Sequence, residues 1–280
     1  MKIAILTDSS CNLTKEYVSE HKNLFIVPLG ITVDNEQFRD QVDISSKEVY
    51  SKLDTHDVKS SLPSIGDITK KIEEIIELGY DKIFVISISS GLSGTYNAVR
   101  LAVEDIDFDI TIFDSKTLSM GLGYIVKKAV KLLDKSVDLD DIIKLLNEFR
   151  YNKLIAVFTL NTLKYLRAGG RIGKVEGTIG DILKIKPIIK VNDDGVYETI
   201  AKGRGNRRAL SKTIDIIVER FKGKKINLTV HYGNDFEKAT MLLERLKELL
   251  DIEESELVEL TPVLGIHTGP GLIAVIAHEV

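Results

Sequence analysis

Short apolar runs alternate with amphipathic stretches along the first half of the chain, and this alternation constrains the fold more than any other feature. Segment 82–89 has the length of a buried strand, whereas 66–79 carries apolar residues at helical spacing and ends at Gly79. Strand–helix–strand order is typical of a parallel sheet with helices on both faces. The pattern predicts strands within 3–10, 25–33, 82–89 and 109–115, and helices within 14–21, 45–53, 66–79, 94–106 and 121–133.

The second half of the chain has a different order of elements. A helix predicted over 138–152 follows the helix 121–133 with no strand between them, so we place a domain boundary near residue 152. Segment 182–203 is typical of a β-hairpin, because two strand-like runs flank an Asn-Asp-Asp-Gly turn. Further strands are predicted within 153–160, 226–233, 255–263 and 271–280, and helices within 161–170, 208–221 and 236–250.

The predicted fold class is therefore α/β with two domains. Residues 1–152 are expected to form an N-terminal domain with a parallel sheet and helices on both of its faces. Residues 153–280 are expected to form a C-terminal α/β domain with a mixed sheet, since the hairpin supplies antiparallel pairing.

Composition excludes several classes of protein. The chain of 280 residues is 44% hydrophobic, enough for a sizeable core, and its net charge of −4 gives no reason to expect nucleic acid as a partner. The single cysteine, Cys11, rules out a disulfide framework, and the five histidines are scattered, so no metal or other cofactor is expected. The N-terminal apolar run ends at Leu6 and is too short for a signal peptide. The sequence has no run of about 18 apolar residues, so no membrane span is expected. These features predict a cytoplasmic location.

Positive charge is concentrated in one part of the sequence. Residues 161–225 contain 16 Lys and Arg against 7 Asp and Glu, a local net charge of +9 in a chain whose total is −4. A solvated basic face is one interpretation of this stretch. A docking surface for an anionic partner, such as a phosphate or an acidic protein, is the other.

Four turns rich in hydroxyl groups are the strongest local signal for a site. They occupy residues 7–10, 60–64, 89–95 and 266–271. The first and third follow strands of the predicted parallel sheet, so both should lie at the sheet edge where ligands bind. Ser93, Gly94 and Thr95 also stand at the start of a predicted helix, where free N–H groups and the helix dipole favour an anion. This pattern predicts an anion site that includes Ser93.

Two other interpretations of the hydroxyl turns remain open. The run Gly91-Leu92-Ser93-Gly94-Thr95 resembles the elbow of serine hydrolases but lacks its last glycine. A serine esterase or a kinase-like transferase would use Ser93 with His267, the only histidine in a glycine- and proline-rich turn, and with Asp8 or Asp114 as the acid. Alternatively, the hydroxyls are only helix caps and the chain is a plain interaction protein.

Taken together, the motifs resemble those of the DegV family of bacterial proteins along nearly the whole chain. The matching segments, in family order, are ILTDSSCNLT, KSSLPS, ISSGLSGTYNA, TLKYLRAGGRIG, LKIKPII and HTGPG. The resemblance implies a two-domain α/β protein that binds one long-chain fatty acid between its domains and needs no other cofactor. It further implies a carrier that presents the fatty acid to a separate fatty acid kinase subunit, similar to dihydroxyacetone kinases. That subunit would form an acyl-phosphate that feeds phospholipid synthesis.

The resemblance also implies which residues form the site. The carboxylate would be held by Ser60 and Ser93, with His267 approaching from the C-terminal domain. Ser60 stands where the family usually has threonine, so Ser61 is the alternative donor. The remaining candidates for the carboxylate site are Gly94 and Thr268.

Two arginines match basic positions of the family. Arg171 follows the Gly-Gly pair of the TLKYLRAGGRIG motif, and Arg204 follows the predicted hairpin. Both fall in the basic stretch 161–225, and we expect them to contribute to docking of the kinase partner or to gating.

Overall fold

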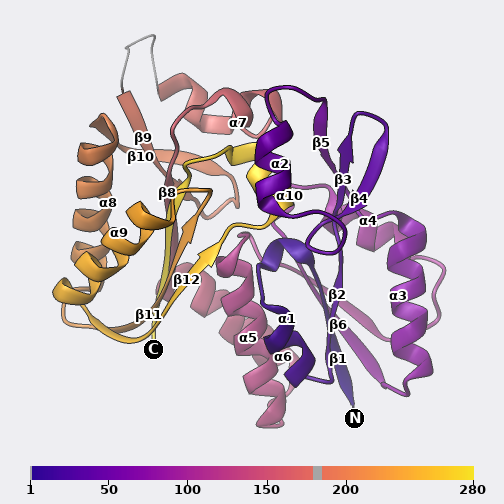
Figure 1. Ribbon diagram of the computed structural model, residues 1–280. Coiled ribbons are helices and arrows are strands. Elements are labelled where there is room, and N and C mark those ends of the chain that lie inside the picture. Colours follow the sequence, from indigo (N-terminus) through magenta and orange to yellow (C-terminus); the bar gives the residue numbers. More distant parts are fainter. Residues whose placement is uncertain (1, 179–184) are drawn as a thin grey trace.

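The computed structural model describes residues 2–178 and 185–280 and contains two large sheets that lie side by side (Figure 1). The first sheet has four strands, all parallel, as the alternation of strands and helices predicts. Its strands, in order across the sheet, are β2 (Leu24–Val27), β1 (Ile3–Asp8), β6 (Lys82–Ser87) and β7 (Ile110–Asp114).

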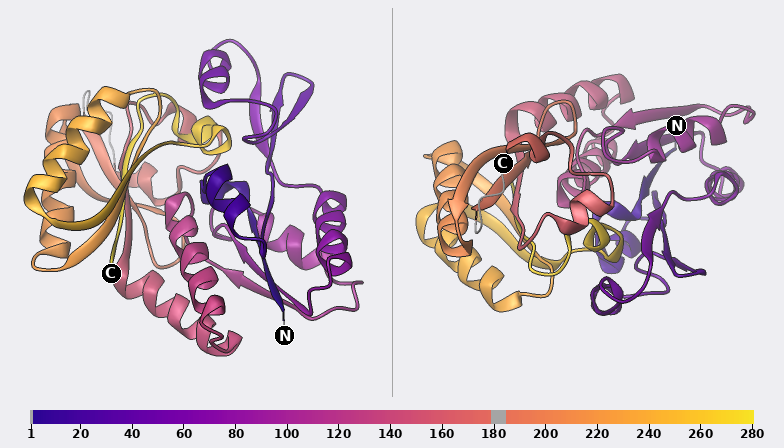
Figure 2. Two further views of the ribbon diagram at one scale, coloured as in Figure 1. Left: turned by 60° about the horizontal axis from the view of Figure 1, so that its bottom comes forward. Right: turned by 90° about the horizontal axis from the view of Figure 1, so that it is seen from above.

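Helices cover both faces of this parallel sheet (Figure 2). Successive strand residues point to opposite faces, so Ile83 and Val85 pack against one set of helices while Phe84 and Ile86 face the other. The first set is α3 (Ile65–Glu77) and α4 (Thr95–Ala102), and the second is α5 (Met120–Asp134) and α6 (Leu139–Glu148).

The second sheet is mixed, which agrees with the predicted C-terminal architecture. Its order is β10 (Tyr197–Arg204), β9 (Ile185–Val191), β8 (Leu154–Thr159), β13 (Ile273–Glu279), β11 (Lys225–Tyr232) and β12 (Asp251–Glu259). Only β11 and β12 pair in parallel. The β9–β10 hairpin confirms the prediction for 182–203, of which 182–184 lie outside the described residues. The domain limits, 1–152 and 153–280, stay a prediction.

The two faces of the six-stranded sheet have different neighbours. Helices α8 (Asn206–Phe221) and α9 (Phe236–Leu249) pack on one face, where they bury Val275 and Ala277 of β13. The other face carries Ala274 and Ile276 of the same strand into a core shared with α5. The region between the two large sheets is thus lined by apolar side chains from both halves of the chain.

A third, small sheet was not predicted from the sequence. It is antiparallel, in the order β4 (Glu36–Arg39), β3 (Gly30–Val33) and β5 (Val58–Ser61). Helix α2 (Ser46–Lys52) lies between β4 and β5 in the chain. The prediction of one strand over 25–33 was wrong, because Pro28 has no N–H to donate and separates β2 from β3. Through this small sheet, residue Ser60 reaches the region between the large sheets.

Only part of the C-terminal HTGPG segment forms the predicted turn: His267 and Thr268 end a helix, whereas residues 270 and 271 form a turn. Residues Pro262–Thr268 form helix α10, whereas the strand predicted over 255–263 ends at Glu259. Proline suits the first turn of a helix because its missing N–H has no helical partner there. The buried carboxylate of Asp40 accepts a hydrogen bond from the Val263 N–H at 2.9 Å, which anchors the start of α10.

Several predicted helix starts are confirmed. Thr14 caps α1 (Lys15–Glu20), and Ser45 forms a capping box with Glu48 at the start of α2. The short helix predicted within 161–170 is α7 (Lys164–Ala168). Within the described ranges, every helix is too short or too polar to cross a lipid bilayer.

Candidate functional site

Ser60 and His267 meet between the two halves of the chain. Ser60 is on β5 and His267 is in the last turn of α10, yet Ser60 Oγ and His267 Nε2 are 2.7 Å apart in a hydrogen bond. Ser60 and Ser61 are neighbours on one strand, so their side chains leave it on opposite sides. The contact with His267 therefore favours Ser60 over Ser61 as the donor at this point.

Ser93 lies at the start of α4 and lines the same cavity as Ser60 and His267. Its hydroxyl is 2.8 Å from Thr95 Oγ1 and accepts a hydrogen bond from the Thr95 N–H at 3.3 Å. The cavity has a volume of about 130 Å³. We call it the head-group cavity, and its lining residues are Leu29, Ser60, Ser61, Leu62, Ile88, Leu92, Ser93, Leu118, Arg171, Tyr197, Val263, Leu264 and His267.

The charge of the head-group cavity is positive. Arg171 lines it and donates hydrogen bonds to the main-chain carbonyls of Leu92 and Gly169, at 3.2 and 2.6 Å. No Asp or Glu is among the described residues that line the cavity, and no described carboxylate pairs with Arg171. Hydroxyl groups and a guanidinium without a counter-ion make a site that favours an anion.

His267 is neutral at neutral pH. Burial, together with the positive charge of Arg171, lowers the pKa of the His267 imidazole to about 4. Its Nδ1 atom is buried and has no hydrogen-bond partner among the described residues. Gly169 packs so closely against the ring that any side chain at that position would collide with it. The close fit explains why the Gly-Gly pair before Arg171 begins with a residue that lacks a Cβ atom.

A second, apolar void adjoins the head-group cavity. Its volume is about 40 Å³, and it shares Leu118, Tyr197 and Leu264 with the head-group cavity. We call it the inner void. Its lining residues are Leu118, Ser119, Ala156, Val157, Phe158, Val191, Tyr197, Leu260, Leu264, Thr268, Leu272, Ala274 and Ile276.

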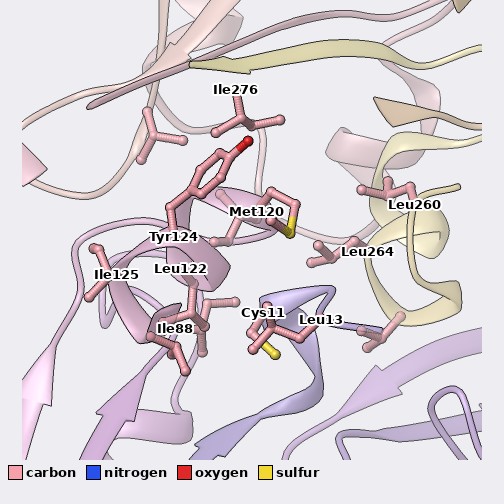
Figure 3. Close-up of a cluster of buried hydrophobic side chains, with 14 of the residues drawn as sticks. Cys11, Leu13, Ile88, Met120, Leu122, Tyr124, Ile125, Leu260, Leu264 and Ile276 are labelled. Atoms are coloured by element: carbon pink, nitrogen blue, oxygen red, sulfur yellow. The ribbon is translucent and has the colours of Figure 1, made fainter. Parts of the chain in front are cut away.

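The inner void lies in the core between the two large sheets. Figure 3 shows Met120 and Tyr124 of α5 directed toward the same space as Leu264 of α10 and Ile276 of β13. The void is therefore bordered by elements from both halves of the chain. Its lining consists mostly of apolar side chains, and Ser119, Thr268 and Tyr197 are the residues in it that carry a hydroxyl group.

The remaining predicted site residues lie around these two cavities. Gly94 does not line the head-group cavity but an adjoining outer groove, which also includes Ser90, Ser93 and Arg171. Thr268 lines the inner void instead, and its hydroxyl donates to the Leu264 carbonyl at 3.1 Å. Arg204 is exposed at the end of β10 and lines neither cavity. The roles of all these residues stay predictions.

The apolar and aromatic lining residues of both cavities were not found from the sequence. Among them, Leu118, Tyr197 and Leu264 line both cavities. Apolar residues that line a cavity and apolar residues that fill a core have the same sequence pattern, so no local signal distinguishes them. Tyr197 opens the second strand of the predicted hairpin, where an aromatic residue is common in any sheet.

The geometry differs from that of a serine hydrolase. The Ser93 hydroxyl is paired with Thr95, and His267 is paired with Ser60 instead. Within the described ranges, neither Asp8 nor Asp114 contacts His267: Asp8 bonds to Ser10 and Ile88, and Asp114 bonds to Lys116 and Ser90. A nucleophile, a base and an orienting acid are thus not brought together.

Comparison with known proteins places these features in a family. A family model described as an uncharacterised protein, DegV family, matches residues 2–280. A DegV domain-containing protein of Clostridium perfringens is 39% identical over 275 residues, which are 98% of this chain and 97% of the relative. One from Clostridium acetobutylicum is 36% identical over 279 residues and 99% of both chains.

Solved structures show the same fold. A DegV family protein from Thermus thermophilus, described by its fatty acid binding, has a TM-score of 0.93 and 27% identity over all of both chains. DegV from Bacillus subtilis, described as a fatty acid binding protein, has a TM-score of 0.90 and 28% identity, also over all of both chains. A stearic acid-binding protein from Eubacterium ventriosum has a TM-score of 0.88 and 27% identity, covering 99% of this chain and 98% of the other.

Proposed function

This chain belongs to the DegV family, and we propose from its site geometry that it binds one long-chain fatty acid between its two domains, 1–152 and 153–280. The carboxylate occupies the head-group cavity, where Ser60, Ser93 and His267 face it. The acyl chain passes Leu118 and Leu264 into the inner void. The protein acts as a lipid carrier without catalysis of its own.

One observation carries this proposal: a positively charged cavity lined by hydroxyl groups adjoins an apolar void. A carboxylate in an apolar interior would be strongly destabilised without donors. Ser60, Ser93 and the Arg171 charge supply donors and an opposite charge at one end only. The lining at the other end is mostly apolar, so an amphiphile with an anionic head fits both ends.

The two cavities are small for a long acyl chain. Their volumes, about 130 and about 40 Å³, are together close to that of an engineered cavity of about 150 Å³ that holds benzene. Binding therefore requires the lining side chains to repack around the ligand. Burial of about 14 methylenes would contribute roughly 11 kcal/mol before the losses of translational and chain freedom. This gain is large enough to drive such a rearrangement.

The carboxylate dependence of binding tests this proposal. In titrations of delipidated protein, we expect palmitic acid to bind while its methyl ester binds about a hundredfold more weakly. The ester keeps the acyl chain but loses the charge that strengthens hydrogen bonds from hydroxyl and guanidinium groups. Equal affinity for acid and ester would show that the head-group cavity does not recognise a carboxylate.

The finer part of the proposal concerns the use of the bound fatty acid. We infer that the carrier presents the carboxylate to a separate kinase subunit, which forms an acyl-phosphate for phospholipid synthesis. The outer groove supports this role, since it shares Ser93 and Arg171 with the head-group cavity and has a volume of about 290 Å³. A cytoplasmic location would suit this exchange and remains a prediction.

Arg204 should separate docking of the kinase subunit from lipid binding. Because Arg204 is exposed and lines neither cavity, Arg204→Ala is expected to lower kinase turnover about tenfold while leaving fatty acid affinity unchanged. Arg171→Ala should affect both activities, since Arg171 lines the head-group cavity. Coupled turnover assays and lipid titrations measure the two effects. Equal losses of turnover and affinity in Arg204→Ala would contradict a docking role.

A further inference from the structure

Ser119 carries an unused hydroxyl group beside the inner void. The residue is only 7% exposed, and its Oγ atom has no hydrogen-bond partner among the described residues. Ser119 stands at the start of α5, where a serine normally caps the helix, but its side chain makes no capping bond. Buried hydroxyls without partners are uncommon in folded proteins, so this one requires an explanation.

The other small hydroxyl beside the inner void does have a partner. Thr268 donates to the Leu264 carbonyl at 3.1 Å, and the void is otherwise lined almost entirely by carbon atoms. Ser119 is therefore the exception in its surroundings. Its neighbour Leu118 lines both the inner void and the head-group cavity, so an acyl chain reaches Ser119 as it leaves the head-group cavity.

The backbone of Ser119 is also held in an unfavourable conformation. Its φ of 55° and ψ of −149° belong to a region that glycine adopts readily and residues with a Cβ atom rarely do. Helix α5 helps to fix this conformation, because the Ser119 carbonyl accepts the Gly123 N–H at 3.0 Å. A serine kept at a position suited to glycine, with its hydroxyl unpaired, suggests that the hydroxyl serves a ligand.

We propose that the Ser119 hydroxyl hydrogen-bonds to an oxygen carried within the acyl chain, so that the preferred ligand class is a hydroxylated fatty acid. The inference rests on the proposed function and concerns the same pair of cavities. A saturated chain offers Ser119 neither a donor nor an acceptor, whereas an in-chain hydroxyl offers both. A cis double bond offers only a weak contact to its π electrons.

Competition binding to delipidated protein tests the inference with stearic acid, oleic acid and a positional series of hydroxystearic acids. We expect the wild type to bind at least one hydroxystearic isomer about tenfold more tightly than stearic acid, near the upper end for one hydrogen bond. Ser119→Ala removes the hydroxyl, but alanine has a Cβ atom, so the backbone conformation at this position stays unfavourable. Ser119→Gly removes the hydroxyl and suits the backbone, so it remains usable if the alanine variant folds poorly.

Both variants are expected to lose the preference for the hydroxylated isomer, measured as the ratio of its affinity to that of stearic acid in the same protein. Equal affinity of the wild type for stearic acid and every isomer would overturn the inference, as would a preference that persists in both variants. A preference for oleic acid that both variants lose would also overturn it, in favour of recognition of the double bond. Failure of the wild type to bind any of these acids would instead refute the proposed function.

Discussion

Replacing both Ser60 and Ser93 by alanine is expected to weaken fatty acid binding by about a hundredfold to ten-thousandfold. Each hydroxyl lines the head-group cavity, and a hydrogen bond to a charged group contributes about 1.5–3 kcal/mol. Without both hydroxyls, the buried carboxylate beside Arg171 lacks hydrogen-bond donors, which destabilises the bound state. Titration of delipidated protein with palmitic acid measures the change.

Ser61→Ala is the matched control for this double variant. Ser61 also lines the head-group cavity, but it is exposed and its side chain leaves β5 on the opposite side from Ser60, so its loss should change affinity by no more than about twofold. Thermal unfolding of all three proteins checks that the changes do not act through stability. If the double variant binds palmitic acid like the wild type, Ser60 and Ser93 do not bind the carboxylate. If Ser61→Ala has a large effect, Ser61 rather than Ser60 is the donor.

Filling the inner void is expected to shorten the fatty acid that the protein accepts. Ala274 of β13 lines the void and is paired with Phe158 of β8, so its small side chain leaves space beside a large one. Ala274→Leu places three more carbon atoms there. If about four methylenes are excluded at roughly 0.8 kcal/mol each, stearic acid should bind about a hundredfold more weakly while decanoic acid binds as before.

Ala277→Leu is the control for overpacking. Ala277 is on the same strand but faces α8 and α9, away from the inner void. This variant should lower thermal stability, because added methylenes strain a packed core, yet it should keep the order of affinities among chain lengths. An unchanged length preference in Ala274→Leu, or the same shift in Ala277→Leu, would show that the acyl chain does not follow the inner void.

Local patterns in the sequence were sufficient to predict the two large sheets. The alternation of strands and helices predicted the parallel sheet, and the Asn-Asp-Asp-Gly turn predicted the β9–β10 hairpin. The helix predicted within 45–53 begins at a capping box of Ser45 and Glu48, which depends on residues three apart. Each of these features is set by neighbours in the chain, which is why they can be predicted without a structure.

The small sheet and α10 could not be predicted in the same way. The apolar residues on both sides of Pro28 have the composition of a single strand, although they pair in different sheets. Helix α10 contains Gly265 and lies between two segments that suggest turns, and it depends on Asp40 for its start. Tertiary contacts decide the conformation of both segments.

The candidate site depends on contacts between distant residues. Ser60 and His267 are 207 positions apart, and their assignment to one site came from the resemblance to a family rather than from any pattern in the sequence. The positive φ of Ser119 likewise has no signature, because serine is an ordinary residue at a helix start. The hydroxyl-rich turns indicated an anion site, but the partners within it required the fold.

Native mass spectrometry of the protein purified without delipidation tests the central claim most directly. We expect a species heavier than the polypeptide by the mass of one long-chain fatty acid, which disappears on denaturation and is recovered as a free acid in an organic extract. A spectrum with the bare polypeptide alone, unchanged after incubation with palmitic, stearic or oleic acid, would contradict the claim that the paired cavities hold a single lipid.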